Sequence, residues 1–174
     1  MTYTRAIGIV FDRVILLIVR GLALSRIHPN VLTFVGLVIN GVAALLLARG
    51  RFLAAGVVII LAGIFDMVDG RVARATRQVT AFGGFFDSVV DRYSDLVLLM
   101  GLLVYYASIN RFFYVVLTAV VMTGSVMVSY TRARAEHVIP QCRAGFMERP
   151  ERIVLLIIGA LFNRMAQVLW VIAV

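Results

Sequence analysis

The chain has 174 residues, of which 62% are hydrophobic and only 15% are charged, and its mean hydropathy is +0.99. A soluble domain is usually about half apolar and about a quarter charged, so this composition excludes an ordinary soluble fold. It predicts a membrane protein instead. At this length the chain can form about five or six membrane-crossing helices within one domain, residues 1–174, with little chain outside the bilayer.

The basic residues carry further information, because all seventeen are arginines and they are unevenly placed. Most lie in residues 5–26, 71–77 and 132–152, and the positive-inside rule predicts that these stretches face the cytoplasm. A formal net charge of +8 could also suggest nucleic acid. Anionic lipid headgroups and phosphorylated substrates are simpler partners for a membrane protein, so we expect no nucleic-acid partner.

The first half of the chain predicts an interfacial segment followed by three spans. In residues 1–26, arginines interrupt short apolar runs, which indicates an amphipathic helix lying in the membrane interface. The first span covers Val31–Ala48, with Pro29 near its first helical position. A second helix runs from Phe52 through Arg77, and a third span covers Phe82–Ser108.

The second half predicts a fourth span over Phe112–Tyr130, then a polar stretch, then a helix opening at Pro150 and apolar over Ile153–Phe162. Asn163-Arg164 then interrupts the apolar pattern. A continuous helix would place Arg164 within the membrane, at a cost of about 2.5–3.5 kcal/mol. We therefore favour a turn there, followed by a short last segment. The expected fold is an all-α polytopic membrane bundle of about six transmembrane helices after the interfacial helix.

Five of the nine acidic residues lie between Asp66 and Asp95, inside or beside the predicted spans. Asp66 and Asp69 are three residues apart, and Asp87 and Asp91 are four apart, so each pair shares a helix face. A tight connection near residues 77–80 would make the two helices antiparallel neighbours. We therefore expect the four carboxylates to converge.

Four unpaired carboxylates at a membrane boundary would repel one another unless cations compensate them. Hard divalent cations take oxygen ligands, and two-metal sites clamp phosphoryl groups. No histidine or cysteine lies near the cluster in sequence, which disfavours zinc. One alternative is a network of ion pairs with nearby arginines, namely Arg71, Arg74, Arg77 and Arg92. Another is a divalent-cation transporter, because intramembrane carboxylates also line ion pathways.

The spacing Asp66-x-x-Asp69-Gly70-x-x-Ala73-Arg74, then Gly83, Asp87 and Asp91, resembles the signature of the CDP-alcohol phosphotransferases at every specified position. The resemblance implies a six-helix homodimeric enzyme of the inner membrane, with its site open to the cytoplasm. It implies that two Mg²⁺ or Mn²⁺ ions bind to Asp66, Asp69, Asp87 and Asp91. It further implies that Asp91 is the general base, and that the CDP/CMP moiety binds at Gly70, Ala73, Arg74 and Gly83.

Two later segments, residues 129–136 and 145–152, resemble the bacterial phosphatidylinositol phosphate synthases. This resemblance implies an acceptor-phosphate site made of Ser129, Arg132, Arg134 and Arg152, with Arg149 as a further candidate. Arg132 stands where those synthases commonly carry lysine, which keeps the charge and changes the geometry. The alternative is that these arginines are only a cytoplasmic basic cluster.

The function implied is transfer of the phosphatidyl group from CDP-diacylglycerol to a hydroxyl of a polar acceptor, with release of CMP. Inositol phosphate is the expected acceptor, and glycerol 3-phosphate is the alternative within the same chemistry. The compact arrangement of the acidic residues favours an enzyme over a cation transporter.

Overall fold

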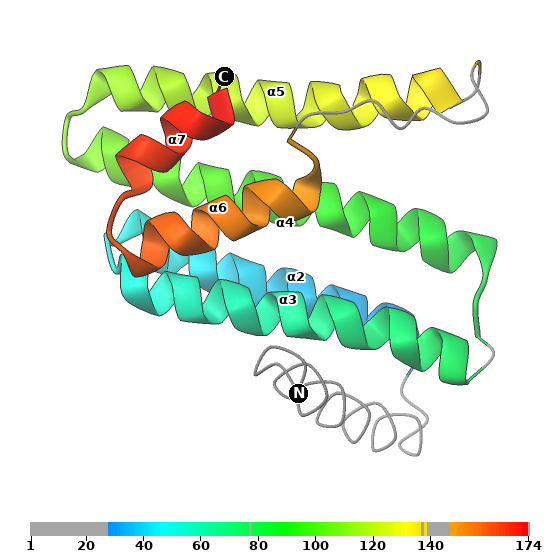
Figure 1. Cartoon of the computed structure of the whole chain (residues 1–174). Coiled ribbons are helices and arrows are strands. Elements are labelled where there is room, and N and C mark those ends of the chain that lie inside the picture. The colour runs from blue at the N-terminus through cyan, green and yellow to red at the C-terminus, as the bar shows by residue number, and fades with distance from the viewer. Residues whose placement is uncertain (1–27, 77, 137, 139–146, 174) are drawn as a thin grey trace, which may run out of the picture.

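A computed structural model describes residues 28–76, 78–136, 138 and 147–173, and within these ranges every regular element is a helix. The all-α expectation is therefore confirmed for this part of the chain, whereas the expected interfacial helix at residues 1–26 lies outside it. The helices, labelled in Figure 1, are α2 (Pro29–Ala48), α3 (Phe52–Ala75), α4 (Ala81–Ser108), α5 (Phe112–Glu136), α6 (Arg149–Leu161) and α7 (Met165–Ala173).

Local chemistry sets the helix ends close to where the sequence predicted them. His28 caps α2, its ring nitrogen accepting a hydrogen bond of 3.3 Å from the Asn30 N–H, with Pro29 in the first turn. The turn between α2 and α3 contains Gly50 with φ 70°, a conformation that favours glycine.

The helix α5 extends beyond its predicted end at Tyr130, and the polar residues up to Glu136 are helical. The ion pair between Arg132 and Glu136, at 3.2 Å and with i,i+4 spacing, supports this last polar turn. The helix is therefore six residues longer than the predicted fourth span. By contrast, α3 ends at Ala75, two residues earlier than predicted.

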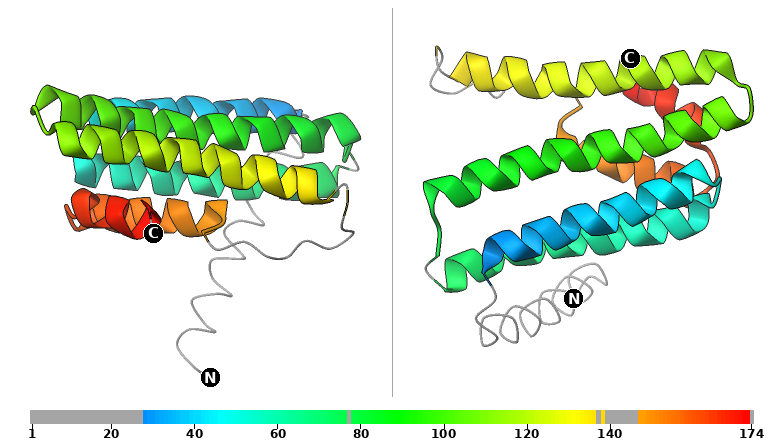
Figure 2. Two further views of the ribbon diagram at one scale, coloured as in Figure 1. Left: turned by 90° about the horizontal axis from the view of Figure 1, so that it is seen from above. Right: turned by 180° about the vertical axis from the view of Figure 1, so that it is seen from behind.

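The helix α2 is the centre of the packing around the acidic residues. It packs along both α3 and α4, while α4 packs along α5, and α6 lies on α3 (Figures 1 and 2). The helices α3 and α4 each pack along α2, and carboxylates from both of them meet, as expected of neighbouring helices. Gly101 of α4 permits the close approach, since a Cβ there would lie 2.4 Å from the carbonyl oxygen of Ala44.

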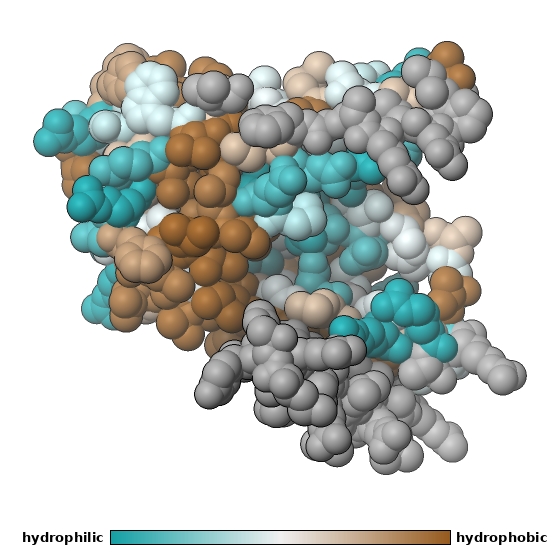
Figure 3. Space-filling view, in the orientation of Figure 1, coloured by the Kyte–Doolittle hydropathy of each residue, from teal (hydrophilic) through white to brown (hydrophobic). Residues whose placement is uncertain are grey.

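The hydrophobic core occupies one half of the bundle and the polar residues gather in the other. Fully buried side chains of α2, α3, α4 and α7, including Leu47, Ile59, Leu98, Leu102 and Leu169, form this core. In Figure 3 an apolar band lies to the left of centre and hydrophilic side chains gather to its right. A smaller hydrophobic cluster of Leu32, Val68 and Val72 joins α2 to α3 in the other half, beside the polar groups.

Three of the described helices are long and apolar enough to cross a membrane, namely α2, the segment Phe52–Arg74 of α3, and α5. The helix α4 has 28 residues but carries Asp87, Asp91, Arg92 and Asp95 in its first part. With 13 and 9 residues, α6 and α7 rise about 20 and about 14 Å, less than the roughly 30 Å of hydrocarbon. They meet at a turn where Asn163 has φ 54°, which confirms the predicted break at Asn163-Arg164.

Candidate active site

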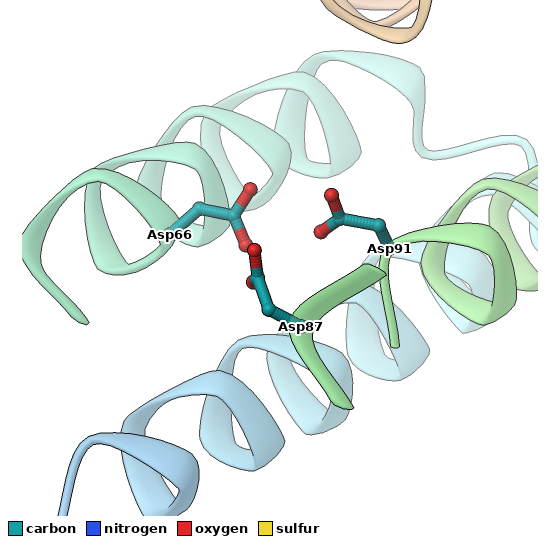
Figure 4. A group of neighbouring side chains, drawn as sticks. All are labelled: Asp66, Asp87 and Asp91. Carbon is teal, nitrogen blue, oxygen red and sulfur yellow. The ribbon is translucent and has the colours of Figure 1, made fainter. Parts of the chain in front are cut away.

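Three carboxylates from two helices meet in the polar half of the bundle. Asp66 comes from α3, and Asp87 and Asp91 come from α4, with one oxygen of each within 4.8 Å of the others. Figure 4 shows the three side chains directed toward one another. Asp69 lies in α3, but its side chain is outside the described part of the structure, so its expected place in the cluster stays a prediction.

An arginine from a distant part of the sequence contacts this cluster. Arg149, the first residue of α6, has Nη1 2.8 Å from Asp66 Oδ2 and Nη2 3.0 Å from Asp91 Oδ1. The alternative ion-pair network had been expected from arginines near the motif. One of these, Arg92, instead donates to the Ser88 carbonyl of its own helix.

The donor set fits a divalent cation. Three carboxylates and one guanidinium leave an excess of negative charge, and carboxylate oxygens are the ligands that Mg²⁺ and Mn²⁺ prefer. Asp91 Oδ1 is buried and has no hydrogen-bond partner among the described residues, although Arg149 lies beside it. An oxygen of this kind retains the capacity to bind a cation or to accept a proton.

A cavity of about 250 Å³ adjoins the cluster at Asp87. Every residue that the family resemblance assigned to the CDP/CMP moiety lines this cavity. These are Gly70, Ala73 and Arg74 of α3 and Gly83 of α4. The start of α2 forms a further wall that the sequence analysis missed, made of Pro29, Asn30 and Thr33. Residues His28 to Asn30 had been interpreted only as a helix start, and no motif signalled a role in binding.

Two glycines keep this cavity open. A Cβ at Gly83 would lie 3.1 Å from Thr80 Oγ1, which itself accepts a 2.9 Å hydrogen bond from the Gly83 N–H as the N-cap of α4. The same Cβ would lie 3.5 Å from Asn30 Oδ1. A Cβ at Gly70 would lie 3.7 Å from both terminal nitrogens of Arg74. The small residues therefore leave room for a ligand between the helices and beside the guanidinium.

A second cavity, of about 130 Å³, adjoins the cluster at Asp91 and is far more highly charged. Its lining residues come from α4, α5 and α6: Asp91, Arg92, Asp95, Ser129, Arg149 and Arg152. Two of the four residues expected to hold the acceptor phosphate, Ser129 and Arg152, line this second cavity. Arg149, the further candidate, also lines it.

The other two expected acceptor residues lie elsewhere. Arg132 is exposed and pairs with Glu136 at 3.2 Å and Glu148 at 2.6 Å, and Arg134 is exposed in the last turn of α5. Arg132 is held by these two glutamates, and Arg134 faces another side because α5 stays helical here and residues two apart on a helix do not share a face. Neither side chain lines the cavity beside Asp91.

One face of α4 connects the two cavities. Gly83 lines the first cavity, Asp87 and Asp91 belong to the carboxylate cluster, and Asp95 lines the second. Successive members are four residues apart, a rise of about 6 Å each along the helix. The carboxylates thus separate a glycine-lined cavity from an arginine-lined one.

The fold and the site define an integral membrane protein with a carboxylate cluster suited to divalent cations. Residues 26–174 match the family model described as CDP-alcohol phosphatidyltransferase, and the chain belongs to this family of enzymes. The match covers all of the described structure.

Individual relatives agree with this assignment. The archaetidylinositol phosphate synthase of Pyrococcus horikoshii is 39% identical over 143 residues, which cover 82% of this chain and 73% of that protein. The crystal structure of Mycobacterium tuberculosis phosphatidylinositol phosphate synthase with CDP-DAG bound has a TM-score of 0.84 at 31% identity, covering 92% of this chain and 86% of that one. The structure of the same synthase with manganese and citrate has a TM-score of 0.83 at 32% identity, covering 90% and 80%.

Proposed function

We propose that this protein transfers the phosphatidyl group of CDP-diacylglycerol to a hydroxyl of inositol phosphate and releases CMP. The observation that carries the proposal is the position of the carboxylate cluster between two unlike cavities. One is lined by glycines and Arg74 and suits a nucleotide, and the other is lined by Arg149 and Arg152 and suits a phosphate. The relatives named above are synthases of inositol-phosphate lipids, which supports the same acceptor.

In this proposal the donor lies in the cavity beside Asp87. Arg74 donates hydrogen bonds to the diphosphate, and a planar guanidinium can do so with two parallel N–H groups. Gly70, Ala73 and Gly83 keep side chains away from the nucleotide, so the backbone can approach it closely. Asn30, in the first turn of α2, also lines this cavity.

The carboxylates hold the metal. Asp66, Asp87 and Asp91 would bind Mg²⁺ or Mn²⁺, with Asp69 as the further ligand expected from the family resemblance. When bound, two such ions neutralise charge on the diphosphate and on the leaving phosphate. The manganese bound by the M. tuberculosis synthase supports this choice of cation.

The transfer itself is a displacement at the lipid-side phosphorus. The acceptor hydroxyl oxygen forms the new P–O bond, the bond to the CMP phosphate breaks, and CMP leaves as the anion. Asp91 is the general base that accepts the hydroxyl proton in this scheme. Asp91 lines the acceptor cavity and also belongs to the carboxylate cluster, so it adjoins both the hydroxyl and the phosphorus in this scheme.

We place the site on the cytoplasmic side of the inner membrane, while the count of six membrane-crossing helices stays a prediction because α6 and α7 are each shorter than the hydrocarbon layer. The end of the bundle near the site carries Arg71, Arg74, Arg132, Arg134, Arg149 and Arg152, whereas the opposite turns carry Arg49, Arg51, Arg111 and Arg164. This asymmetry supports the orientation by the positive-inside rule. The homodimer is proposed from the family resemblance and is tested by measuring the mass of the protein in detergent.

The compact cluster argues against cation transport, because carboxylates that line an ion pathway would be spread along the bundle. A transporter would also have no use for the glycine-lined cavity beside Asp87. Uptake of a divalent ion into proteoliposomes, without CMP release from CDP-diacylglycerol, would reverse this conclusion.

The experiment that tests the function uses purified protein, CDP-diacylglycerol and Mg²⁺ with four acceptors in parallel. These are inositol 1-phosphate, glycerol 3-phosphate, free inositol and serine, and the readouts are CMP release and the mass of the lipid product. We expect inositol 1-phosphate to give the highest kcat/KM. Preference for glycerol 3-phosphate would change the acceptor and keep the chemistry, whereas preference for inositol or serine would contradict a phosphate-binding acceptor site.

A further inference from the structure

Asp95 lies one helical turn beyond Asp91 on the same face of α4, outside the eight-position family motif. It is the fifteenth residue of the helix, about 21 Å from the start of α4. The residue is only 5% exposed. An ionised carboxylate at such a position is very unfavourable unless it is paired and hydrogen-bonded.

Its partner is Arg152, which is equally buried. Arg152 Nη2 donates to Asp95 Oδ2 at 2.6 Å, and Arg152 Nη1 donates to the carbonyl oxygen of Met147 at 2.8 Å. Met147 has φ 64°, an uncommon backbone conformation for a residue other than glycine. Asp95 of α4 thus holds Arg152 in the first turn of α6, and Arg152 in turn holds the backbone just before that helix.

Arg149, whose terminal nitrogens pair with Asp66 and Asp91, also approaches Asp95 through its Nε. It precedes Arg152 by three residues in α6, so the two arginines share a helix face. Arg149 Nε lies 3.4 Å from Asp95 Oδ1, and both atoms are buried without a hydrogen-bond partner among the described residues. Both arginines line the cavity beside Asp91.

We infer that Asp95 is a positioning residue that orients Arg152, and through it Arg149, to receive a phosphate of the acceptor. This inference rests on the proposed function. Asp95 contributes one negative charge against two guanidinium groups, so the three residues together keep a positive charge that attracts a phosphate dianion. Because Asp95 itself holds Arg152, the acceptor does not have to order that side chain as it binds.

The test compares Asp95→Asn with Ser94→Ala, a control in the same helix at a similarly buried polar residue. Steady-state kinetics use whichever phosphorylated acceptor the wild-type protein prefers, and equilibrium binding of inositol 1-phosphate and of CMP is measured separately. We expect Asp95→Asn to raise the KM and the Kd for the phosphorylated acceptor about tenfold or more, since charge-assisted contacts are affected. The KM for CDP-diacylglycerol and the Kd for CMP should stay within about twofold of the control.

The pair is then tested in an Arg152→Gln background, where Asp95 has no arginine to hold. Adding Asp95→Asn to Arg152→Gln should alter the acceptor KM by no more than about twofold relative to Arg152→Gln alone. The double variant removes both charges together, so neither residue is left as an unpaired buried ion. If Asp95→Asn alone does not fold, Asp95→Glu keeps the charge but displaces the carboxylate, and it should still raise the acceptor KM.

An acceptor KM equal to that of the control in Asp95→Asn or in Asp95→Glu would overturn the inference. So would an equal rise with and without Arg152, because Asp95 would then act independently of that arginine. The wild-type acceptor panel separates this result from the proposed function. If the wild-type protein prefers glycerol 3-phosphate, the proposed acceptor changes and the positioning role of Asp95 still holds. If it prefers an uncharged alcohol, both the phosphate-binding acceptor site and the positioning role are wrong.

Discussion

The two cavities that adjoin the carboxylate cluster are built in different ways. The cavity beside Asp87 is shaped by backbone, because glycines and close packing of α3 and α4 along α2 leave a space with few charges. The cavity beside Asp91 is shaped by ion pairs that join α4 to the first turn of α6. The difference suggests that a site can recognise one substrate by shape and the other by charge, with the shared carboxylates between them.

The largest effect should come from the residue between the two cavities. Asp91→Asn keeps the size of the side chain and removes its ability to accept a proton, so turnover should fall by about 10²–10⁴-fold. CMP binding in the absence of a divalent cation, which depends on the other cavity, should change little. Single-turnover CMP release and equilibrium CMP binding measure the two effects. Near-normal turnover would remove Asp91 from the proton transfer.

Asp66→Asn should act on the cation and, through it, on the donor side. Loss of one carboxylate charge from a hard-cation site should weaken Mn²⁺ binding on the order of a hundredfold, because the ligand charge sets the affinity. Metal-dependent CMP binding should weaken with it. Titration calorimetry with Mn²⁺ alone and then with CMP gives both values. Unchanged Mn²⁺ affinity in both Asp66→Asn and Asp87→Asn would mean that the cluster is not the metal site.

A charge removed from the second cavity should affect only the acceptor. Arg149→Gln should raise the KM for the phosphorylated acceptor about ten- to a hundredfold, since a hydrogen bond to a charged group is worth about 1.5–3 kcal/mol. Mn²⁺ binding should not weaken, because Arg149 shares oxygens with the cation.

Gly83→Ala is the matched variant for the first cavity. Its Cβ would crowd Thr80 Oγ1 at 3.1 Å, so the KM for CDP-diacylglycerol should rise and that for the acceptor should not. If Arg149→Gln and Gly83→Ala each raised both KM values equally, the division of the site into two cavities would be wrong.

The smallest effect is expected at Arg132. This side chain is exposed and paired with Glu136 and Glu148, outside the lining of the cavity, so Arg132→Ala should change the acceptor KM by about twofold or less. The same kinetic assay measures it. A tenfold rise would show that Arg132 leaves its glutamates to bind the acceptor, as the sequence resemblance had implied.

The sequence predicted the first cavity far better than the second, for a physical reason. The family resemblance assigned Gly70, Ala73, Arg74 and Gly83 to the nucleotide, and a local motif can carry this information because these residues lie within a few turns of the acidic residues. The role of α2 in that cavity could not be predicted, because it follows from packing along α3 and α4 rather than from any motif. The turn at Asn163 was predictable from the cost of placing Arg164 in the bilayer.

The second cavity depends on where α6 begins relative to α4, and no local pattern contains that information. Arg149 reaches Asp66 across 83 residues of sequence. The pairing of Arg132 with Glu136 and Glu148 is likewise set by where α6 begins, and Arg134 faces away from Arg132 because α5 continues as a helix. Asp95 was recognised only as a member of the acidic stretch, because its pairing with Arg152 is a tertiary contact.

In the proposed site the carboxylates separate two cavities that can be filled at the same time. The most direct measurement is titration of wild-type protein, in Mn²⁺ and without lipid substrate, with inositol 1-phosphate in the absence and in the presence of saturating CMP. We predict that both ligands bind together, and that CMP changes the inositol 1-phosphate Kd by no more than a few-fold. Strict competition, with the apparent Kd rising in proportion to the CMP concentration, would contradict the account.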